Sequence, residues 1–332
     1  MKIRSLVASA ILTAACACAW AQPITLKFAH VSQPTHPLTV GAQKFAELLA
    51  KSSEGRIRVQ ELGGGTLGSE AQILSAVQGG FIDVTVTATP TLSAVVKDFS
   101  LLDIPFTFTK AEQVDALMAG PFGEQLMAKL QPKNLIGLGI METGFRNVTN
   151  SRRPIASVDD LRGLKLRVMP SPLFIETFST LKTNPVPMAF TELYAALESR
   201  AMDAQENPYS AILAGRFYEV QKYLSVTNHI YTANVVLIGK KSWDRLSSAD
   251  RKLVQDAATE ASAFQRKYSR ENAAADRKAL ESKMQVNDVP PEVLAKMRET
   301  TQPVADKFVE SHDKSIVQIY RSEIERVRTL QH

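Results

Sequence analysis

The sequence predicts an α/β protein made of two lobes. From residue 24 to about residue 141, short segments typical of strands lie between segments typical of helices. The strand-like segments are apolar or alternate apolar with polar residues, and the same order of segments recurs after Arg146. Strand–helix–strand order with short connections is typical of parallel pairing in an α/β sheet. Neither a tandem repeat nor a flexible linker separates the two halves. We therefore expect two closely coupled lobes that share crossover strands.

The first half should contain a strand at 24–29, a helix at 37–55, a strand at 56–62, a helix at 69–80 and a strand at 82–87. Apolar residues of the first helix, such as Phe45 and Leu49, recur on one face. Ser69 and Gln72 form a capping box at the start of the second helix, and the glycines at 79–80 end it. Alternation or β-branched residues mark the strands.

The second half should contain a strand at 164–168, a helix at 173–181, a strand at 184–186, a helix at 191–199 and a strand at 231–239. Residues 250–283 are rich in Ala and charge and lack Gly and Pro, and residues 303–330 are similar. Long helices with polar faces at the end of an α/β chain usually brace it. We expect two such helices here.

The first 21 residues have the pattern of a secretory signal. Lys2 and Arg4 give a positive start, residues 6–19 form a nearly uncharged run, and Ala19-Trp20-Ala21 is a cleavage site of small residues. The apolar run is shorter than the ~20 residues needed to span a bilayer, which disfavours a retained membrane anchor. Lipidation at Cys16 is a further, poorly spaced alternative. We expect an exported protein.

The composition of the exported chain excludes several chemistries. The full chain has 332 residues and a net charge of +5, and its two cysteines are Cys16 and Cys18. Removal of residues 1–21 takes away two positive charges and leaves 311 residues, a charge near +3 and no cysteine. Thiol catalysis, cysteine zinc sites and iron–sulfur clusters are thereby excluded. The sharpest basic cluster, Arg152–Arg153, is too small for a nucleic-acid surface.

A dinucleotide-binding motif is suggested and then contradicted by its context. Gly63-x-Gly65-x-x-Gly68 lies between a predicted strand and a predicted helix, with Asp83 twenty residues after the first glycine. In that motif the third glycine packs inside the helix start, whereas the Ser69 capping box places this helix after Gly68. The favoured interpretation is a glycine turn, and we expect no cofactor.

Metal and hydrolase signatures are weak. No two histidines have the i, i+4 spacing of a zinc helix, and no G-x-S-x-G motif occurs. His30 and His36 flank the loop after the first strand, where turn and capping roles compete equally with ligand contact. A catalytic triad assembled from distant residues would not show in the sequence. An exported hydrolase acting on an acidic substrate therefore stays as the alternative function.

Arg167 is the residue most suggestive of ligand binding. It lies in a predicted strand where alternation puts Lys165 and Arg167 on one face and the apolar residues on the other. A guanidinium at the carboxyl end of a parallel strand is where α/β sheets present ligands, and arginine suits a bidentate contact with a carboxylate. The competing interpretation is an internal ion pair with Asp or Glu.

Several motifs spread over the chain together resemble the DctP-type substrate-binding proteins of tripartite ATP-independent periplasmic (TRAP) transporters. They are Phe-Ala-His-Val (28–31), Leu-Gly-Ser-Glu (67–70), Asp-Ile-Pro-Phe (103–106), Arg-Val-Met-Pro-Ser-Pro (167–172), Asp-Ala-Gln-Glu-Asn-Pro (203–208) and Tyr-Glu-Val-Gln-Lys-Tyr-Leu (218–224). Most members of that family have glycine where this chain has Ala204, a small change that should leave the turn intact.

The resemblance implies a periplasmic-binding-protein-like fold with a ligand cleft between two α/β lobes. Lobe I would comprise residues 22–144 and 233–272, and lobe II residues 145–232 and 273–332. The implied ligand contacts are Arg167, Arg146, Asn207, Glu70, Tyr231 and His30, the last interchangeable with Ser32. Arg167 would pair with a carboxylate of the ligand, Arg146 would be a second cleft arginine, and Asn207 would contact the same carboxylate.

The implied function is transport without catalysis. The protein would capture a small organic acid in the periplasm, either a C4-dicarboxylate or a related 2-oxo or 2-hydroxy acid. It would then deliver this carboxylate ligand to the small and large membrane subunits of a TRAP transporter. We expect a monomer with no catalytic residues, no metal, no cofactor and no nucleic-acid partner.

Overall fold

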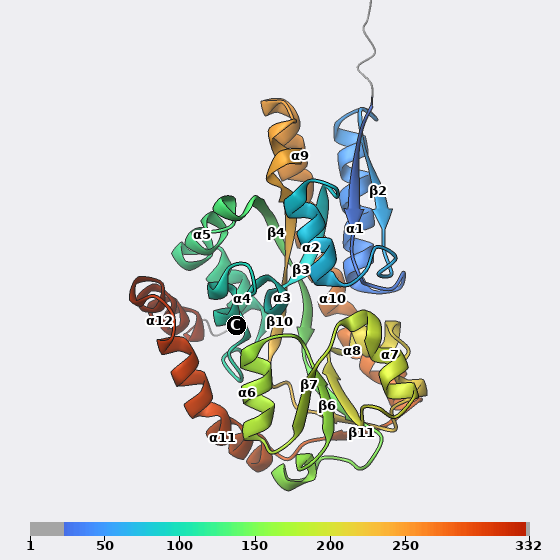
Figure 1. The fold of residues 1–332 in the computed structure, drawn as a ribbon, viewed down its shortest axis with the longest axis vertical. Coiled ribbons are helices and arrows are strands. Elements are labelled where there is room, and N and C mark those ends of the chain that lie inside the picture. Colours follow the sequence, from blue (N-terminus) through green and yellow to red (C-terminus); the bar gives the residue numbers. More distant parts are fainter. Residues whose placement is uncertain (1–22, 330–332) are drawn as a thin grey trace, which may run out of the picture.

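The computed structural model describes residues 23–329, which form two sheets flanked by helices (Figure 1). The predicted secretory signal at 1–21, with its alternative of lipidation at Cys16, lies outside the described residues. The five-stranded sheet has the order β2-β1-β3-β10-β4 and the six-stranded sheet the order β11-β9-β5-β8-β6-β7. Among residues 23–329, no helix combines the length and the apolar character needed to cross a bilayer.

The first sheet consists of β1 (Ile24–Ala29), β2 (Ile57–Leu62), β3 (Val84–Ala88), β4 (Leu135–Phe145) and β10 (Tyr231–Gly239). As predicted, β1 runs parallel to β2 and β3. The strand β10 is antiparallel to both β3 and β4. This mixed direction arises because β10 enters the first sheet from the second lobe and therefore runs against β3.

Helices cover both faces of the first sheet. One face packs against α1 (Pro37–Ser52) and the long α10 (Ser248–Glu281). The other packs against α2 (Glu70–Gly79), α4 (Ala111–Met118), α5 (Pro121–Ala128) and α12 (Lys314–Arg328). Short elements complete this lobe: α3 (Thr89–Leu92), α9 (Lys240–Asp244) and 3₁₀ turns at Lys97–Asp103 and Gln131–Lys133. The resulting layers are those of an α/β domain.

The second sheet consists of β5 (Asn147–Asn150), β6 (Lys165–Val168), β7 (Asn184–Pro187), β8 (Ala204–Asn207), β9 (Tyr223–Val226) and β11 (Gln285–Asp288). The strand β6 is parallel to its neighbours β7 and β8, so its carboxyl end is a predicted ligand edge. The other elements of this lobe are α6 (Pro172–Thr180), α7 (Phe190–Glu198), α8 (Tyr209–Ala214), α11 (Pro291–Glu310) and 3₁₀ turns at Val158–Leu161 and Phe217–Glu219.

Several segments join the two sheets. Strand β4 leads into β5 through Arg146, and β9 returns to β10 through residues 227–230. The two crossings are hydrogen-bonded to each other: Arg146 N donates to Ile230 O at 2.8 Å and His229 N donates to Arg146 O at 3.2 Å. In addition, α10 packs on β4 of the first sheet and on α8 beside the second. The two sheets are thus coupled by hydrogen bonds and by helix packing.

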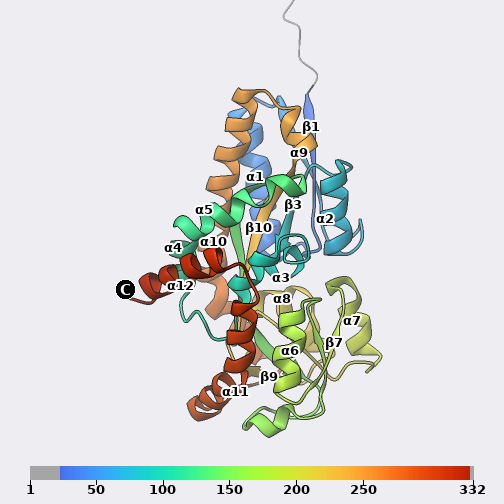
Figure 2. The same cartoon turned by 60° about the vertical axis from the view of Figure 1, so that its left-hand side comes forward.

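The exact lobe boundaries stay a prediction. Sequence-based boundaries assign residues 273–332 to lobe II, and α11 does pack on α6 there. However, α12 lies against α4 and α5, beside the first sheet (Figure 2). Helix α12 therefore packs against lobe I, although the predicted boundaries assign its residues to lobe II.

The prediction of a single helix at 303–330 is wrong. The chain forms α11, which begins earlier, at Pro291, and then α12. The break occurs because Asp313 caps a new helix, its Oδ1 accepting Ser315 N at 2.8 Å. Pro303 lies inside α11 and does not start a helix. The other predicted strands and helices are found within three residues of their expected bounds, and the capping box at Ser69 is present.

Candidate ligand site between the lobes

A small cavity of about 60 Å³ lies between the two sheets and is lined by both. Its lining residues are Val31, Ser32, His36, Leu38, Glu70, Val86, Ala88, Thr143, Arg146, Arg167, Met169, Phe190, Asn207, Ala211, Thr232 and Asn234. Four of the six predicted contacts are among them: Arg146, Arg167, Asn207 and Glu70. Clefts that combine apolar walls with a few converging polar groups are typical of small-molecule sites.

Arg167 is a buried cation held by the backbone. Its Nε and Nη2 donate to Met188 O at 2.9 and 2.7 Å, so the hydrogen bonds that orient it go to a carbonyl and not to an internal carboxylate. Its Nη1 is buried and has no hydrogen-bond partner among residues 23–329. Burial lowers the pKa of Arg167 to about 10, so the guanidinium keeps its proton at neutral pH. Among residues 23–329 the side chain therefore has a free donor and no direct ion pair, although the carboxylates of Glu206 and Glu70 act on its charge.

Arg146 is equally buried, but its charge is matched within the protein. Its Nε and Nη2 donate to the two carboxylate oxygens of Glu206, and Nη1 donates to Thr232 Oγ1 at 3.1 Å. On the other side of Glu206, His229 Nε2 lies 3.1 Å from Oε2. Burial opposes ionisation of Glu206, yet Arg146 and His229 outweigh it and lower the pKa of this carboxyl. Of the two cavity arginines, Arg167 is thus the better anion receptor.

Asn207 ends β8 within a chain of amide and hydroxyl groups. Its Oδ1 accepts Arg146 Nη2 at 3.2 Å, and its Nδ2 donates to Gln205 Oε1 at 2.5 Å. Gln205 in turn donates to Thr149 Oγ1 at 2.8 Å, and Thr149 donates to Gln221 Oε1 at 3.0 Å. These bonds fix the orientation of the Asn207 amide, which carries a second Nδ2 hydrogen for a ligand oxygen.

Glu70 is a carboxylate in the first lobe that faces the same cavity. It is the first residue of α2, after the Ser69 cap. Its Oε1 accepts Ala88 N at 2.9 Å, and its Oε2 accepts the Thr91 hydroxyl. Burial raises the pKa of Glu70, and these two donors together with Arg167 and Arg146 partly offset that rise. The side chain is held in place as a hydrogen-bond acceptor.

Two predicted contacts do not line the cavity. Tyr231 donates its hydroxyl to Glu142 Oε2 at 2.5 Å, on the opposite face of β10 from Thr232 and Asn234. His30 is buried, and its Nε2 lies 3.0 Å from Glu61 Oε1. The first loop instead contributes Ser32, the alternative that the sequence offered, and His36.

Sequence reasoning missed three polar residues of the cavity: Thr143 on β4, and Thr232 and Asn234 on β10. A signal for two of them was present, because Thr232 and Asn234 interrupt the otherwise apolar segment 231–239 at a spacing of two. His36 has the capping role weighed for it, and it also lines the cavity. Its Nδ1 accepts Leu38 N at 3.1 Å, which caps α1, and its ring lines the cavity.

The glycine motif forms a turn beside the cavity, as the favoured interpretation predicted. Gly64 and Gly65 have φ of 68° and 71°, and they donate to Ser32 O and His30 O at 2.9 and 3.1 Å. A Cβ on Gly65 would lie 2.6 Å from Thr191 Cγ2 of α7, which belongs to the second lobe. The turn therefore lies close to the opposite lobe at Thr191.

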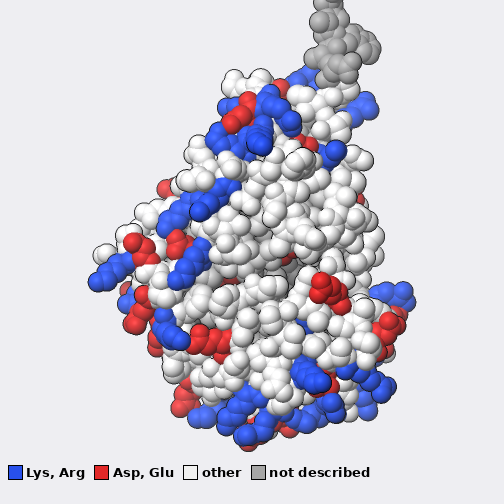
Figure 3. All heavy atoms as spheres, viewed as in Figure 1, with Lys and Arg blue, Asp and Glu red and all other residues white. Residues whose placement is uncertain are grey.

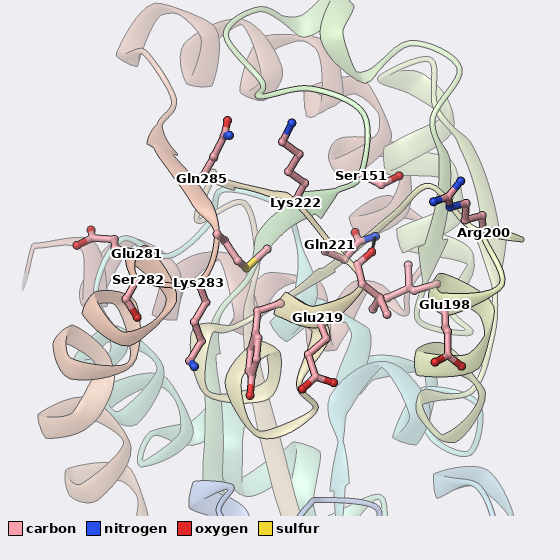
Figure 4. Close-up of a pocket in the computed structure, with 14 residues that line it drawn as sticks. Ser151, Glu198, Arg200, Glu219, Gln221, Lys222, Glu281, Ser282, Lys283 and Gln285 are labelled. Atoms are coloured by element: carbon pink, nitrogen blue, oxygen red, sulfur yellow. Dashed lines mark hydrogen bonds between the residues drawn. The ribbon is translucent and has the colours of Figure 1, made fainter.

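A second, more open hollow lies on the second lobe near β9, β11 and the end of α10 (Figure 4). Its lining includes three acidic side chains and three basic ones, those of Glu198, Glu219, Glu281, Arg200, Lys222 and Lys283. This balance of charges favours no single ligand charge. Charged side chains also gather over the lower lobe in Figure 3, whereas the face over α2 is largely uncharged. Among residues 23–329, no group of three or more His, Cys, Asp or Glu could hold a metal ion.

Comparison with known proteins decides the family. The model of the family described as bacterial extracellular solute-binding protein, family 7, matches residues 28–312. The chain belongs to this family, DctP. The assignment made from the sequence motifs is therefore confirmed, and with it the two-lobed α/β fold with long C-terminal helices.

Solved and curated relatives match three quarters or more of the chain. The galactonate complex of a sugar acid binding protein from Advenella mimigardefordensis has a TM-score of 0.90 and 36% identity over 92% of this chain and 99% of that one. A TRAP periplasmic solute-binding protein from Ochrobactrum anthropi has a TM-score of 0.82 and 42% identity over 94% and 98%. The 2,3-diketo-L-gulonate-binding periplasmic protein of Escherichia coli is 36% identical over 75% of this chain and 76% of its own.

Proposed function

We propose that this protein captures a small organic acid in the interlobe cavity and delivers it to the membrane subunits of a TRAP transporter. The observation that carries the proposal is Arg167, a buried guanidinium whose Nη1 has no partner among the described residues. A carboxylate is the natural counter-charge for such a group, since guanidinium–carboxylate bonds are strong and directional. Arg146, Asn207 and Glu70 complete the proposed contacts.

The strength of such a site suits reversible capture. Each charge-assisted hydrogen bond stabilises the complex by roughly 1.5–3 kcal/mol. A few such bonds give a binding free energy of about −8 kcal/mol, which corresponds to a micromolar dissociation constant. The related proteins that bind galactonate and 2,3-diketo-L-gulonate support an acid as ligand. Membership in a family of solute-binding proteins supports binding without turnover, in place of the exported hydrolase. We also propose that the exported chain acts as a monomer in the periplasm.

Calorimetry on Arg167→Met tests the proposal. The substitution keeps an apolar side chain of similar length but removes the cation. Titrated with D-galactonate, D-erythronate, succinate and L-malate, the wild type should bind at least one acid with micromolar affinity. The variant should stay folded and lose at least a hundredfold in affinity for that acid. If the folded variant binds the acid with unchanged affinity, Arg167 is not a ligand contact and the proposed function is wrong.

A further inference from the structure

We propose that a hollow on the hinge side of the molecule is a second ligand site, which takes a small organic cation and thereby strengthens acid binding in the interlobe cavity. This hinge-side hollow has a volume of about 410 Å³, and residues of both lobes and of α10 line it. Its effect on acid binding rests on the proposed function, because that effect assumes an acid in the cavity. The binding of the cation itself does not.

The hinge-side hollow and the interlobe cavity lie on opposite faces of β10. Tyr231 lines the hollow, whereas Thr232 and Asn234 line the cavity, as the alternation of a strand requires. The second lobe contributes residues 208–210, and α10 contributes residues 269–277, near the point where it passes from β4 to α8. The hollow therefore lies beside the two crossings that connect the lobes.

The wall of the hinge-side hollow is rich in aromatic rings. Phe145 and Tyr231 lie edge to face with ring centroids 5.2 Å apart, and Tyr209 belongs to the same lining. Aromatic rings attract ammonium and guanidinium groups through the negative charge of their faces. Ser210 is buried in this lining, and its Oγ has no hydrogen-bond partner among residues 23–329. The wall thus suits a ligand with an apolar body and a polar, cationic head.

Both arginines of the lining are already paired with acids. Arg270 Nη1 lies 2.7 Å from Asp115 Oδ2, and its Nη2 lies 2.7 Å from Glu142 Oε2. Arg277 Nη2 lies 2.9 Å from Asp288 Oδ2. An anion in the hollow would therefore compete with these carboxylates for each guanidinium.

Asp276 is the acid of the described lining that has no partner. Glu142 is bonded to Arg270, and Glu112 Oε1 lies 3.6 Å from Arg270 Nη1. Asp276 makes no hydrogen bond and no ion pair among residues 23–329, although it is partly buried. Burial raises the pKa of its carboxyl, since no neighbouring cation compensates for the lost water. An ammonium or guanidinium group of a ligand would supply the missing counter-charge.

The position of the hollow links it to closure of the lobes. Arg146 and Arg167 are each 1% exposed, so the lobes are closed over the cavity in this structure. A hinge rotation about the crossings that opens the cavity brings the lobes together on the opposite side, where the hollow lies. A cation that fills the hollow resists this movement. Two ligands that favour the same form strengthen each other's binding.

An Asp276 carboxylate that interacts only with water makes a different prediction. In that case Asp276→Asn would leave the binding of cations unchanged. Glu260→Gln is the matched control, because Glu260 is an exposed acid of the same helix that lies outside the lining of the hollow. Both variants remove one negative charge, so they separate the effect of the site from the effect of net charge.

Calorimetry without any acid tests the cation site. The probes are n-butylamine, 2-phenylethylamine and agmatine, with 1-butanol and 2-phenylethanol as neutral counterparts of the first two. Wild type should bind at least one amine with millimolar or tighter affinity. It should bind that amine about tenfold more tightly than the alcohol, the effect of one charge-assisted hydrogen bond. Asp276→Asn should lose about tenfold, and Glu260→Gln should keep the wild-type affinity.

Two results would overturn the cation site: a wild type that binds no amine, or a folded Asp276→Asn protein that binds the amine as tightly as wild type. If Asp276→Asn does not fold, as judged by its thermal transition, Tyr209→Leu decides. This substitution keeps an apolar side chain and removes an aromatic ring, so it should weaken the amine more than the alcohol. Equal weakening of the two contradicts the inference.

The coupling is tested with the acid that wild type binds best among D-galactonate, D-erythronate, succinate and L-malate. A saturating concentration of the amine should tighten this acid about fivefold in wild type and not in Asp276→Asn. An unchanged or weaker acid affinity in wild type contradicts the coupling. Arg167→Met should still bind the amine. A wild type that binds the amine but no acid defeats the proposed function, whereas one that binds an acid but no amine defeats only this inference.

Discussion

At the scale of single residues, the two cavity arginines are equally buried but have different counter-charges. Arg146 is bonded to both oxygens of Glu206, whereas Arg167 is bonded to the carbonyl of Met188. The sequence placed both residues in the cleft because both lie in recognisable motifs. The sequence could not show that Glu206 neutralises Arg146. Glu206 lies on β8 and Arg146 precedes β5, and only the pairing of these two strands brings the residues together.

Arg146→Met should therefore destabilise the fold, and Arg167→Met should not. Removing one partner of a buried ion pair leaves an uncompensated charge, here Glu206, and costs about 3–5 kcal/mol of unfolding free energy. Urea denaturation measures the loss. Adding Glu206→Gln to Arg146→Met should recover most of it, because no buried carboxylate then remains unpaired. Equal stability of the two single variants would contradict this assignment of charges.

A second residue-scale prediction concerns His36 and acid. Burial, reinforced by His30, lowers the pKa of His36 to about 3. Between that value and the usual pKa of about 6.5, the unfolded chain binds the proton and the folded chain does not, so stability present above pH 6.5 is lost as the pH falls. At pH 5 this amounts to about 2 kcal/mol.

The variant His36→Asn should lose about 2 kcal/mol less than wild type between pH 7.5 and pH 5. Asparagine is a good N-cap, so it keeps an acceptor for Leu38 N while it removes the titrating ring. Urea denaturation at the two pH values measures the difference. Parallel losses in both proteins would show that His36 does not bind the proton on unfolding.

At the scale of elements, local signals predicted about half of the helices and strands that the structure describes, and long-range contacts decided how they pair. The capping box at Ser69 and the alternation at 24–29 depend on neighbouring residues, and both were found. The antiparallel pairing of β10 with β3 depends on the path of the chain through the other lobe. Likewise, strand alternation in β10 turns Tyr231 away from the cavity and Thr232 toward it, a choice that the sequence could not make without knowing the buried face.

The glycine turn carries the element-scale prediction. Gly64 and Gly65 share a positive φ, so alanine at either position should cost about 1–2 kcal/mol of stability. Around Gly64 a Cβ meets nothing within 4 Å, whereas on Gly65 it would lie 2.6 Å from Thr191 Cγ2 in the other lobe. Gly65→Ala should therefore also oppose closure and weaken ligand affinity about tenfold, the effect of about 1.4 kcal/mol of overpacking.

Gly64→Ala is the matched control, because it has the same backbone strain without the contact. Its affinity, measured by calorimetry, should stay within about twofold of wild type. Thr191→Ser removes the offending methyl group and should restore the affinity of the Gly65→Ala protein. If both glycine variants lose affinity equally, the effect comes from the turn itself and not from its contact with α7.

At the scale of the whole molecule, the arrangement of the lobes and the charge of Arg167 are linked. Closing the lobes removes this cation from water, and burying an ion without a counter-charge costs several kcal/mol. A ligand carboxylate removes that cost. Because crossover strands and α10 couple the lobes, the change between open and closed forms should be a hinge motion about these connections.

Small-angle X-ray scattering should accordingly show that the wild-type protein contracts when a tightly binding acid is added. Arg167→Met lacks the cation that favours the open form, so without any acid its radius of gyration should already lie nearer to that of the liganded wild type. Adding acid should then leave the variant unchanged. If the variant without acid is as expanded as the wild type without acid, something other than the unmatched charge of Arg167 holds the lobes apart. The polar wall of Glu70, Asn234 and Thr143, which also loses water on closure, would then be the next group to replace.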